Sequence, residues 1–170
     1  MKKVLRKIAA IVTVASMCML SFTGCSETKS GGSSSSGKES DTINLGFVLP
    51  LTGSVPNLGS AMKNGAELAI EEINNAGGIN GKKIKATIED DENKPATAPN
   101  AITKLIEQDK VDAVLGTYAS SCSIAMAPIA AQNKKVMLSI GSTNAKVTSE
   151  GGEYVFRACF IDPFQGKIAR

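Results

Sequence analysis

The feature that most constrains the fold is a regular alternation of short apolar runs with longer segments of helical periodicity, which begins at Thr42. The apolar runs predict strands at residues 43–49, 84–88, 111–115, 136–140 and, as a shorter fifth, 154–158. The segments between them predict helices with apolar stripes within residues 62–73, 98–106 and 122–131. Strands separated by single helices run parallel. The sequence therefore predicts an α/β fold with a doubly wound parallel sheet that helices cover on both faces.

The first 24 residues have the order of a secretory signal. Four cations, at positions 2, 3, 6 and 7, precede an apolar run over residues 8–20 that is too short to cross a bilayer. The segment Phe22-Thr23-Gly24-Cys25 then resembles the lipobox of bacterial lipoproteins, in which the cysteine becomes the mature N-terminus and carries lipid. The resemblance implies that Cys25 is lipidated. It also implies a protein outside the cytoplasm, anchored to the cell membrane at a cell surface or in a periplasm.

Residues 25–41 contain a Gly-Gly pair and four consecutive serines, and they offer no apolar pattern. Such a segment buries too little surface to offset the entropy of ordering, so we expect a flexible Ser/Gly-rich linker. We expect residues 42–170 to form the folded α/β lobe.

The charge balance excludes a nucleic-acid partner once the signal is set aside. Four of the 19 Lys and Arg residues and none of the 16 acids lie in residues 1–24. The remainder carries 15 basic residues against 16 acids, a net charge of −1, with no basic stripe for a phosphate backbone. Of the four cysteines, only Cys122 and Cys159 fall in the predicted lobe. They are either a disulfide or two small buried thiols.

Several kinds of chemistry lack their usual residues. The chain has no histidine, which removes the usual general base and the commonest neutral metal ligand. Neither of the glycine-rich nucleotide motifs occurs. Asp90-Asp91 follows a predicted strand, but no further motif completes a metal or phosphoacceptor site, so we expect it to cap the next segment. The sequence predicts no metal and no cofactor.

Ligands of an open parallel sheet bind beyond the carboxyl ends of its strands. The predicted loops at that edge are residues 51–59, a segment that starts at Asp90, residues 116–123 and residues 141–144. The last two are rich in small hydroxyl residues and follow strands that should be neighbours. We therefore expect their side chains to lie close together.

The third of these loops leads into a predicted helix, whose first backbone N–H groups are unpaired and lie at the positive end of the helix dipole. Ser120 and Ser121 would add hydroxyl donors, so this helix start can hold a small carboxylate without a cationic side chain. Thr143 could donate to the same anion, and the Gly141 carbonyl could accept from an ammonium group. Each loop alone is equally explained as a helix cap or as a turn.

One pattern suggests an enzyme. Ser60-Ala61-Met62-Lys63 matches S-x-x-K and Ser142-Thr143-Asn144 matches S-x-N, as in exported serine acyl-transfer enzymes that recognise penicillin. The third motif of those enzymes, K-T-G, is absent, and S-x-x-K recurs twice in the serine-rich segment after Cys25. The strand–helix alternation also disfavours their fold.

A set of stretches in the predicted lobe keeps a specific order and spacing. They are residues 46–53, 64–74, 77–81, 90–91, 111–116, 120–121, 127–128, 142–144, 156–157 and 162–166. Together they resemble the substrate-binding proteins of ABC importers for branched-chain amino acids, which have the type I periplasmic-binding-protein fold. The resemblance covers nearly all of the lobe from Asn44 onward. It implies that this chain is the N-terminal lobe of a two-lobed protein, with the second lobe missing.

The resemblance also implies a set of ligand contacts. Ser120 would bind the α-carboxylate of an amino acid through its hydroxyl and backbone N–H, and Thr143 would bind both carboxylate and ammonium. The Gly141 carbonyl would bind the ammonium, and Ser142 of the same loop belongs to the predicted ligand-binding set. The positions that match the lining of the side-chain pocket are Leu58, Tyr118 and Ala119. Leu58 replaces an aromatic residue that is common in the family, which leaves the preferred ligand side chain open.

On function, the resemblance implies a receptor without catalytic activity. It would bind a branched-chain amino acid (Leu, Ile or Val) or a similar small one, and deliver it to the permease and ATPase subunits of an ABC importer. A ligand-sensing ectodomain of the same fold stays open as an alternative. Because the family's chains continue past the position of Arg170 into the second lobe, we expect this chain to be a fragment that presents half a site.

Overall fold

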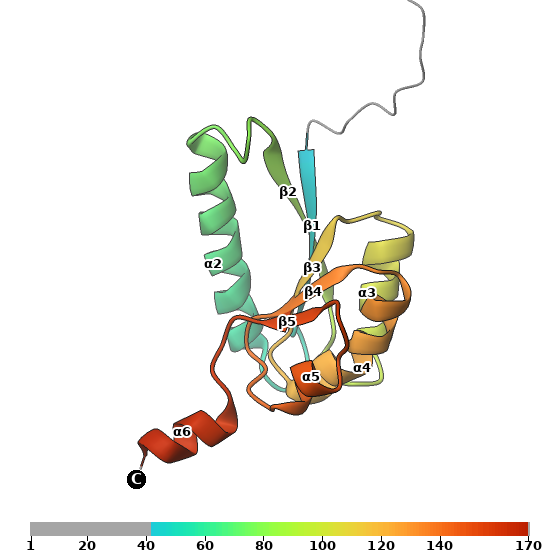
Figure 1. Ribbon diagram of the computed structural model, residues 1–170. Coiled ribbons are helices and arrows are strands. Elements are labelled where there is room, and N and C mark those ends of the chain that lie inside the picture. Colours follow the sequence, from blue (N-terminus) through green and yellow to red (C-terminus); the bar gives the residue numbers. More distant parts are fainter. Residues whose placement is uncertain (1–41, 170) are drawn as a thin grey trace, which may run out of the picture. The chain divides into compact units, whose positions relative to one another are not determined.

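The computed structural model describes residues 42–169 (Figure 1). The signal at 1–24, lipidated Cys25 and the linker at 25–41 lie outside the described residues. Within them, the strands are β1 (Thr42–Leu49), β2 (Lys83–Asp90), β3 (Ala113–Gly116), β4 (Val136–Ser139) and β5 (Val155–Arg157). All pair in parallel, in the order β2-β1-β3-β4-β5. This confirms the predicted α/β class and the parallel sheet.

The helices are α2 (Pro56–Asn75), α3 (Ala98–Glu107), α4 (Ser120–Gln132), α5 (Lys146–Ser149) and α6 (Asp162–Ile168). The first three confirm the predicted helices. Helices α5 and α6 were not predicted, because α5 buries only Val147 and α6 buries no side chain, so neither has an apolar stripe. No helix within residues 42–169 is both long and apolar enough to cross a bilayer.

Two predicted boundaries are wrong for identifiable reasons. Helix α2 begins at Pro56, so Leu58 lies in its first turn and not in a loop; proline suits this position because its missing N–H would have no partner there. Val111 is fully buried but precedes β3, and its N–H donates to the Leu105 carbonyl at 3.1 Å. A buried apolar residue in a connection has the same sequence signature as a strand residue.

One face of the sheet carries the hydrophobic core, under α3 and α4 (Figure 1). The strands contribute fully or almost fully buried side chains to it, at Val48, Val114, Met137 and Val155. The two helices contribute Ile102, Leu105 and Met126, each of which is completely buried. Burying one such side chain stabilises a fold by about 1.5–3 kcal/mol, so this face is the main source of stability.

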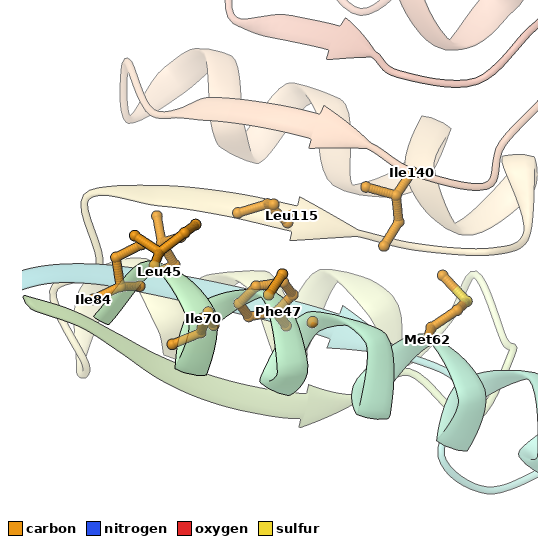
Figure 2. A pocket seen from close by; sticks show the side chains of 10 residues that line it. Leu45, Phe47, Met62, Ile70, Ile84, Leu115 and Ile140 are labelled. Atoms are coloured by element: carbon orange, nitrogen blue, oxygen red, sulfur yellow. The ribbon is translucent and has the colours of Figure 1, made fainter. Parts of the chain in front are cut away.

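The opposite face is only partly covered. Helix α2 lies over β1 and β2 and lines, together with the sheet, an open apolar pocket of about 290 Å³. Figure 2 shows side chains from α2, such as Met62 and Ile70, and from the sheet, such as Phe47 and Leu115, around this space. Farther along the same row of the sheet, Phe156 of β5 is 50% exposed. Among the described residues, the predicted helical cover is therefore complete on one face only.

Candidate ligand-binding site

Because the strands are parallel, their carboxyl ends and the loops that follow meet at one edge of the sheet. The transition from β3 into its loop depends on Gly116, which has φ of 128°. A Cβ atom there would lie 2.1 Å from the Val48 carbonyl oxygen of the neighbouring strand. Only glycine avoids both the backbone strain and this overlap, so the sequence itself fixes where the third loop leaves the sheet.

Asp90, at the end of β2, joins the first loop to the second. Its Oδ1 accepts hydrogen bonds from the backbone N–H groups of Leu51 at 2.9 Å and Glu92 at 2.8 Å, and from that of Thr52 at 3.2 Å. The Thr52 hydroxyl donates to Oδ2. Burial acts to raise the pKa of Asp90, but these four hydrogen bonds to the carboxylate outweigh it and hold the pKa below the ordinary 3.8.

Asp91 joins the second loop to the third. Its side chain is completely buried. One carboxylate oxygen accepts from the Asn93 N–H at 2.9 Å, and the other accepts from the hydroxyl of Thr117, which is also buried. The first contact matches the predicted capping role of the Asp90-Asp91 pair. The contact with Thr117, which lies 26 positions away, was not predicted.

Ser142 joins the third loop to the fourth. It is fully buried, and its hydroxyl lies 3.2 Å from the Thr117 carbonyl oxygen, 3.3 Å from that of Tyr118 and 2.8 Å from the hydroxyl of Ser123. The consistent assignment has Ser123 donating to Ser142, which in turn donates to the carbonyl groups. With its side chain buried and its hydroxyl shared, Ser142 links two loops and is not placed to contact a ligand with that side chain, contrary to the predicted set.

Ser120 stands where the third and fourth loops meet. It is the first residue of α4, and its hydroxyl oxygen accepts a hydrogen bond from the Asn144 N–H at 3.2 Å. The amides of Cys122 and Ser123 both donate to the Ala119 carbonyl, at 3.1 Å each. The amides of Ser120 and Ser121 are the first two of the helix and have no intrahelical acceptor. Two free N–H groups and a hydroxyl therefore lie together at the positive end of α4.

The other predicted contacts lie at the same edge. Gly141 and Thr143 are partly exposed in the fourth loop, one residue on either side of buried Ser142. Tyr118 in the third loop is 38% exposed and Leu58 in the first turn of α2 is 42% exposed. Ala119 is half-buried at the cap of α4. Each of these residues except Ser142 is thus at least partly exposed.

The fourth loop contacts the last residue of β5, Arg157, and the segment that follows it. Arg157 donates through Nη1 to the carbonyl oxygens of Ser142 at 3.2 Å and Asn144 at 2.6 Å, and through Nη2 to Thr148 Oγ1 at 2.7 Å. Cys159 Sγ lies 3.2 Å from the same Ser142 oxygen. Asp91, Thr117 and Arg157 are the residues that sequence reasoning missed. Their contacts are long-range and follow no sequence period; only the Asp-Asp pair gave a signal.

The structure keeps the two cysteines of the lobe as free thiols. Burial, with a smaller effect of the nearby Asp91 carboxylate, raises the pKa of Cys122 to about 12. Cys122 is therefore a neutral core residue at physiological pH and a poor nucleophile. Of the two sequence alternatives, separate thiols describe the structure.

Within residues 42–169, the structure supports neither the S-x-x-K pattern nor a metal site. Ser60 is exposed on α2, and Lys63 Nζ lies 3.7 Å from Glu67 Oε1, in a surface ion pair. No cluster of three or more His, Cys, Asp or Glu residues in the part from 42 to 169 could hold a metal ion. The edge of the sheet instead offers neutral donors and carbonyl acceptors, which suit a small ion held by hydrogen bonds.

The sequence and the fold of the lobe have known relatives. The sequence model of the family described as Periplasmic binding protein matches residues 42–164. Leu/Ile/Val-binding protein homolog 1 of Brucella abortus is 38% identical over 125 residues, which are 74% of this chain and 33% of that protein. The chain thus spans about a third of the length of the curated relatives it matches.

Two solved structures extend the comparison. One is the branched-chain amino acid transporter substrate binding protein LivJ from Streptococcus pneumoniae in complex with isoleucine. It is 38% identical with a TM-score of 0.71, and the match covers 75% of this chain and 36% of that one. The other is a solute binding protein of an ABC transporter from Rhodopseudomonas palustris in complex with 3,4-dihydroxy benzoic acid. It is 27% identical with a TM-score of 0.66, and the match covers 72% and 33%. By its sequence over most of the lobe and by its parallel sheet, the chain belongs to the periplasmic binding protein family.

Proposed function

We propose that this chain forms the N-terminal lobe of an extracytoplasmic receptor that binds a small amino acid and delivers it to the permease and ATPase subunits of an ABC importer. One observation carries the proposal. The Ser120 hydroxyl, bonded to the Asn144 N–H at 3.2 Å, brings a helix start with two free amides against the loop that contains Thr143. This is the combination of donors that can hold a carboxylate in place of water.

In the proposed complex, residues of the third and fourth loops bind the carboxylate and the ammonium group of the amino acid. Ser120 binds the α-carboxylate through its hydroxyl and its backbone N–H. The hydroxyl of Thr143 binds the carboxylate and the ammonium group, and the Gly141 carbonyl accepts from the ammonium. The hydroxyl oxygen of Ser120 already accepts from Asn144, so its own proton is free to be donated to the ligand.

The ligand's side chain would lie against Tyr118, Ala119 and Leu58. These are apolar surfaces that stand partly exposed at the same edge. They fit a branched aliphatic side chain, and the isoleucine complex of the Streptococcus pneumoniae relative supports that class. The relative from Rhodopseudomonas palustris was solved with 3,4-dihydroxy benzoic acid, so an aromatic acid is the competing ligand class. The shared element is the carboxylate, which is why the donors of α4 are the centre of the proposal.

The proposal includes the sequence-based account of the N-terminus. Residues 1–24 would direct export, Cys25 would carry the lipid anchor, and residues 25–41 would be the tether of the binding lobe at 42–170. The family match supports a location outside the cytoplasm. In the whole protein, a second lobe would close over the ligand from the other side. Metabolic labelling with a radioactive fatty acid, lost in a Cys25→Ala variant, tests the anchor.

Calorimetry on the whole protein tests the ligand and the site. We expect binding of L-leucine, L-isoleucine or L-valine, and loss of about tenfold or more in affinity in the Ser120→Ala and Thr143→Val variants, because each removes a hydrogen bond to a charged group. An acid of the same shape that lacks the ammonium group, 4-methylpentanoate, should bind more weakly than leucine.

The Ser149→Ala variant is the matched control, since Ser149 is an exposed serine at the end of α5, outside the four loops. Its affinity should equal that of the unmodified protein. Equal affinities of all these variants would contradict the proposed site. Tighter binding of 4-methylpentanoate than of leucine would contradict the amino acid as ligand class. Membership in a family of binding proteins also argues against the serine acyl-transfer alternative.

A further inference from the structure

The guanidinium group of Arg157 contacts the backbone of the fourth loop at the two residues that flank Thr143. It donates to the Ser142 carbonyl at 3.2 Å and to the Asn144 carbonyl at 2.6 Å. The carbonyl between them, that of Thr143, accepts from the Asp162 N–H at 3.0 Å. Three consecutive carbonyl groups are thus held by donors from the single segment that follows β4.

These contacts determine where the N–H groups of the loop point. In a trans peptide unit the C=O and N–H bonds are antiparallel. The Thr143–Asn144 unit shows the result, because its carbonyl accepts from Asp162 while its N–H donates to the Ser120 hydroxyl. By the same geometry, the bond from Arg157 to the Ser142 carbonyl turns the Thr143 N–H away from Arg157. In the described part of the chain this N–H donates to no protein acceptor.

A guanidinium group is the side chain best suited to this task. It is planar, permanently charged and presents its donors as a rigid fork, so one arginine can bind two carbonyl groups at once. Hydrogen bonds from a charged donor are stronger than neutral ones. Within residues 42–169 the recorded partners of Arg157 are all neutral: two carbonyl groups and the hydroxyl of Thr148. In this range, Arg157 therefore donates to the fourth loop and to α5 and forms no ion pair.

We propose that Arg157 is a positioning residue: it fixes the peptide units around Thr143 so that the Thr143 N–H and hydroxyl face the ligand carboxylate. Arg157 does not touch the ligand itself. The inference rests on the proposed function, because it assigns to this residue the geometry of that site. Without Arg157 the loop samples other orientations, and the measured affinity falls by the fraction of time that the binding orientation is lost.

The test compares Arg157→Met and Arg157→Lys in the whole protein, with L-isoleucine and L-leucine as calorimetric probes. Arg157→Met keeps the length of the side chain and removes all donors, so we expect Kd to rise about tenfold or more. Lysine restores the charge but lacks the fork, so Arg157→Lys should recover part of the affinity. In the ligand-free protein, amide hydrogen exchange of residues 143–148 should accelerate in Arg157→Met, while that of β3 should not change.

Two control variants separate positioning from general destabilisation. Val155→Ala changes the same strand but truncates a side chain that is 4% exposed in the core. It should lower the thermal midpoint and leave Kd within about twofold. Thr148→Val removes the third partner of Arg157 without touching the carbonyl groups beside Thr143. It should change Kd by less than about threefold, since the fork on the loop is intact.

Unchanged affinity in Arg157→Met would overturn the inference. So would an equal loss of affinity in Val155→Ala at a similar thermal midpoint, because Arg157 would then act only through stability. If the unmodified protein binds neither amino acid, the proposed function fails. The hydrogen-exchange data then decide whether Arg157 fixes the loop. Accelerated exchange at residues 143–148 would then still support Arg157 as the residue that fixes the loop, and unchanged exchange would refute it.

Discussion

The face of the sheet under α3 and α4 and the carboxyl edge of the same sheet both contain buried side chains, but the chemistry of those side chains differs. The face is filled by aliphatic and sulfur-containing side chains. The recorded buried polar side chains of the described lobe instead gather at or beside the edge, at Asp91, Thr117, Ser123, Ser139 and Ser142. Apolar burial stabilises almost without regard to direction, whereas a buried polar group is tolerated only with its partners in place. The face therefore provides stability, and the edge provides fixed positions for the loops.

The edge forms a continuous series of links. Asp90 ties the first loop to the second, Asp91 ties the second to the third, Ser142 ties the third to the fourth, and Arg157 ties the fourth to the end of β5. Linked buried hydrogen bonds of this kind make one arrangement of the loops much more favourable than its neighbours. This difference predicts that substitutions in the face lower stability and leave the ligand affinity unchanged. Substitutions at the edge should lower both.

The largest expected effect on stability is that of Leu105→Ala in the core. Leu105 is completely buried between α3 and the sheet, so its truncation should lower the free energy of unfolding by about 2–5 kcal/mol. Urea denaturation of the whole protein measures this, and calorimetry at a temperature where the variant is folded should give an unchanged Kd. A clear loss of affinity in this variant would break the contrast between face and edge.

A smaller loss of stability but a loss of affinity is expected for Asp91→Ala. The change leaves the Thr117 hydroxyl and the Asn93 N–H without their buried acceptor, which should cost about 1–3 kcal/mol of unfolding free energy. The third loop also loses its tie to the second, so Kd should rise. Asp91→Asn keeps one acceptor and should show smaller changes in both measurements. Normal affinity in Asp91→Ala would show that the third loop is positioned without this link.

The smallest effect is a pH dependence that arises from Asp90. Its folded-state pKa is lowered below 3.8, so its carboxylate stabilises the fold fully above that pH, and the contribution disappears as pH falls through the lowered pKa. The difference in unfolding free energy between the unmodified protein and Asp90→Asn should be constant near neutral pH and shrink in this acidic range. Denaturation curves at several pH values measure it. A difference that grows on acidification would contradict the sign.

Much of the fold could be predicted because local sequence patterns determine where its strands and longer helices form. The branched run before Pro50 and the apolar stripe from Met62 to Ile73 gave β1 and α2, and the Gly116 stop gave the end of β3. The two short helices could not be predicted, because α5 buries one side chain and α6 buries none. Neither therefore has an apolar stripe of helical periodicity. The open part of the face beside α2 also has no sequence signal, since Leu115 and Phe156 look like any buried strand residue.

The meeting of the two loops that carry the candidate site was predictable, but the contacts that support these loops were not. Parallel topology alone placed Ser120 and Thr143 at one edge, and the Asn144–Ser120 hydrogen bond confirms that their loops meet. The inward turn of Ser142 could not be predicted, because alternation along a strand does not continue into a loop. The roles of Asp91 and Arg157 depend on partners far away in the sequence, which a local pattern does not contain.

The most direct test of the central claim is a crystal structure of the whole protein with L-isoleucine bound. A carboxylate oxygen of the ligand should lie about 2.7–3.2 Å from the Ser120 hydroxyl and from a free amide of α4, with Thr143 on the same group and Arg157 still on the Ser142 and Asn144 carbonyls. An isoleucine found elsewhere, for example in the apolar pocket under α2, or one that leaves Ser120 and Thr143 without contact, would contradict the account.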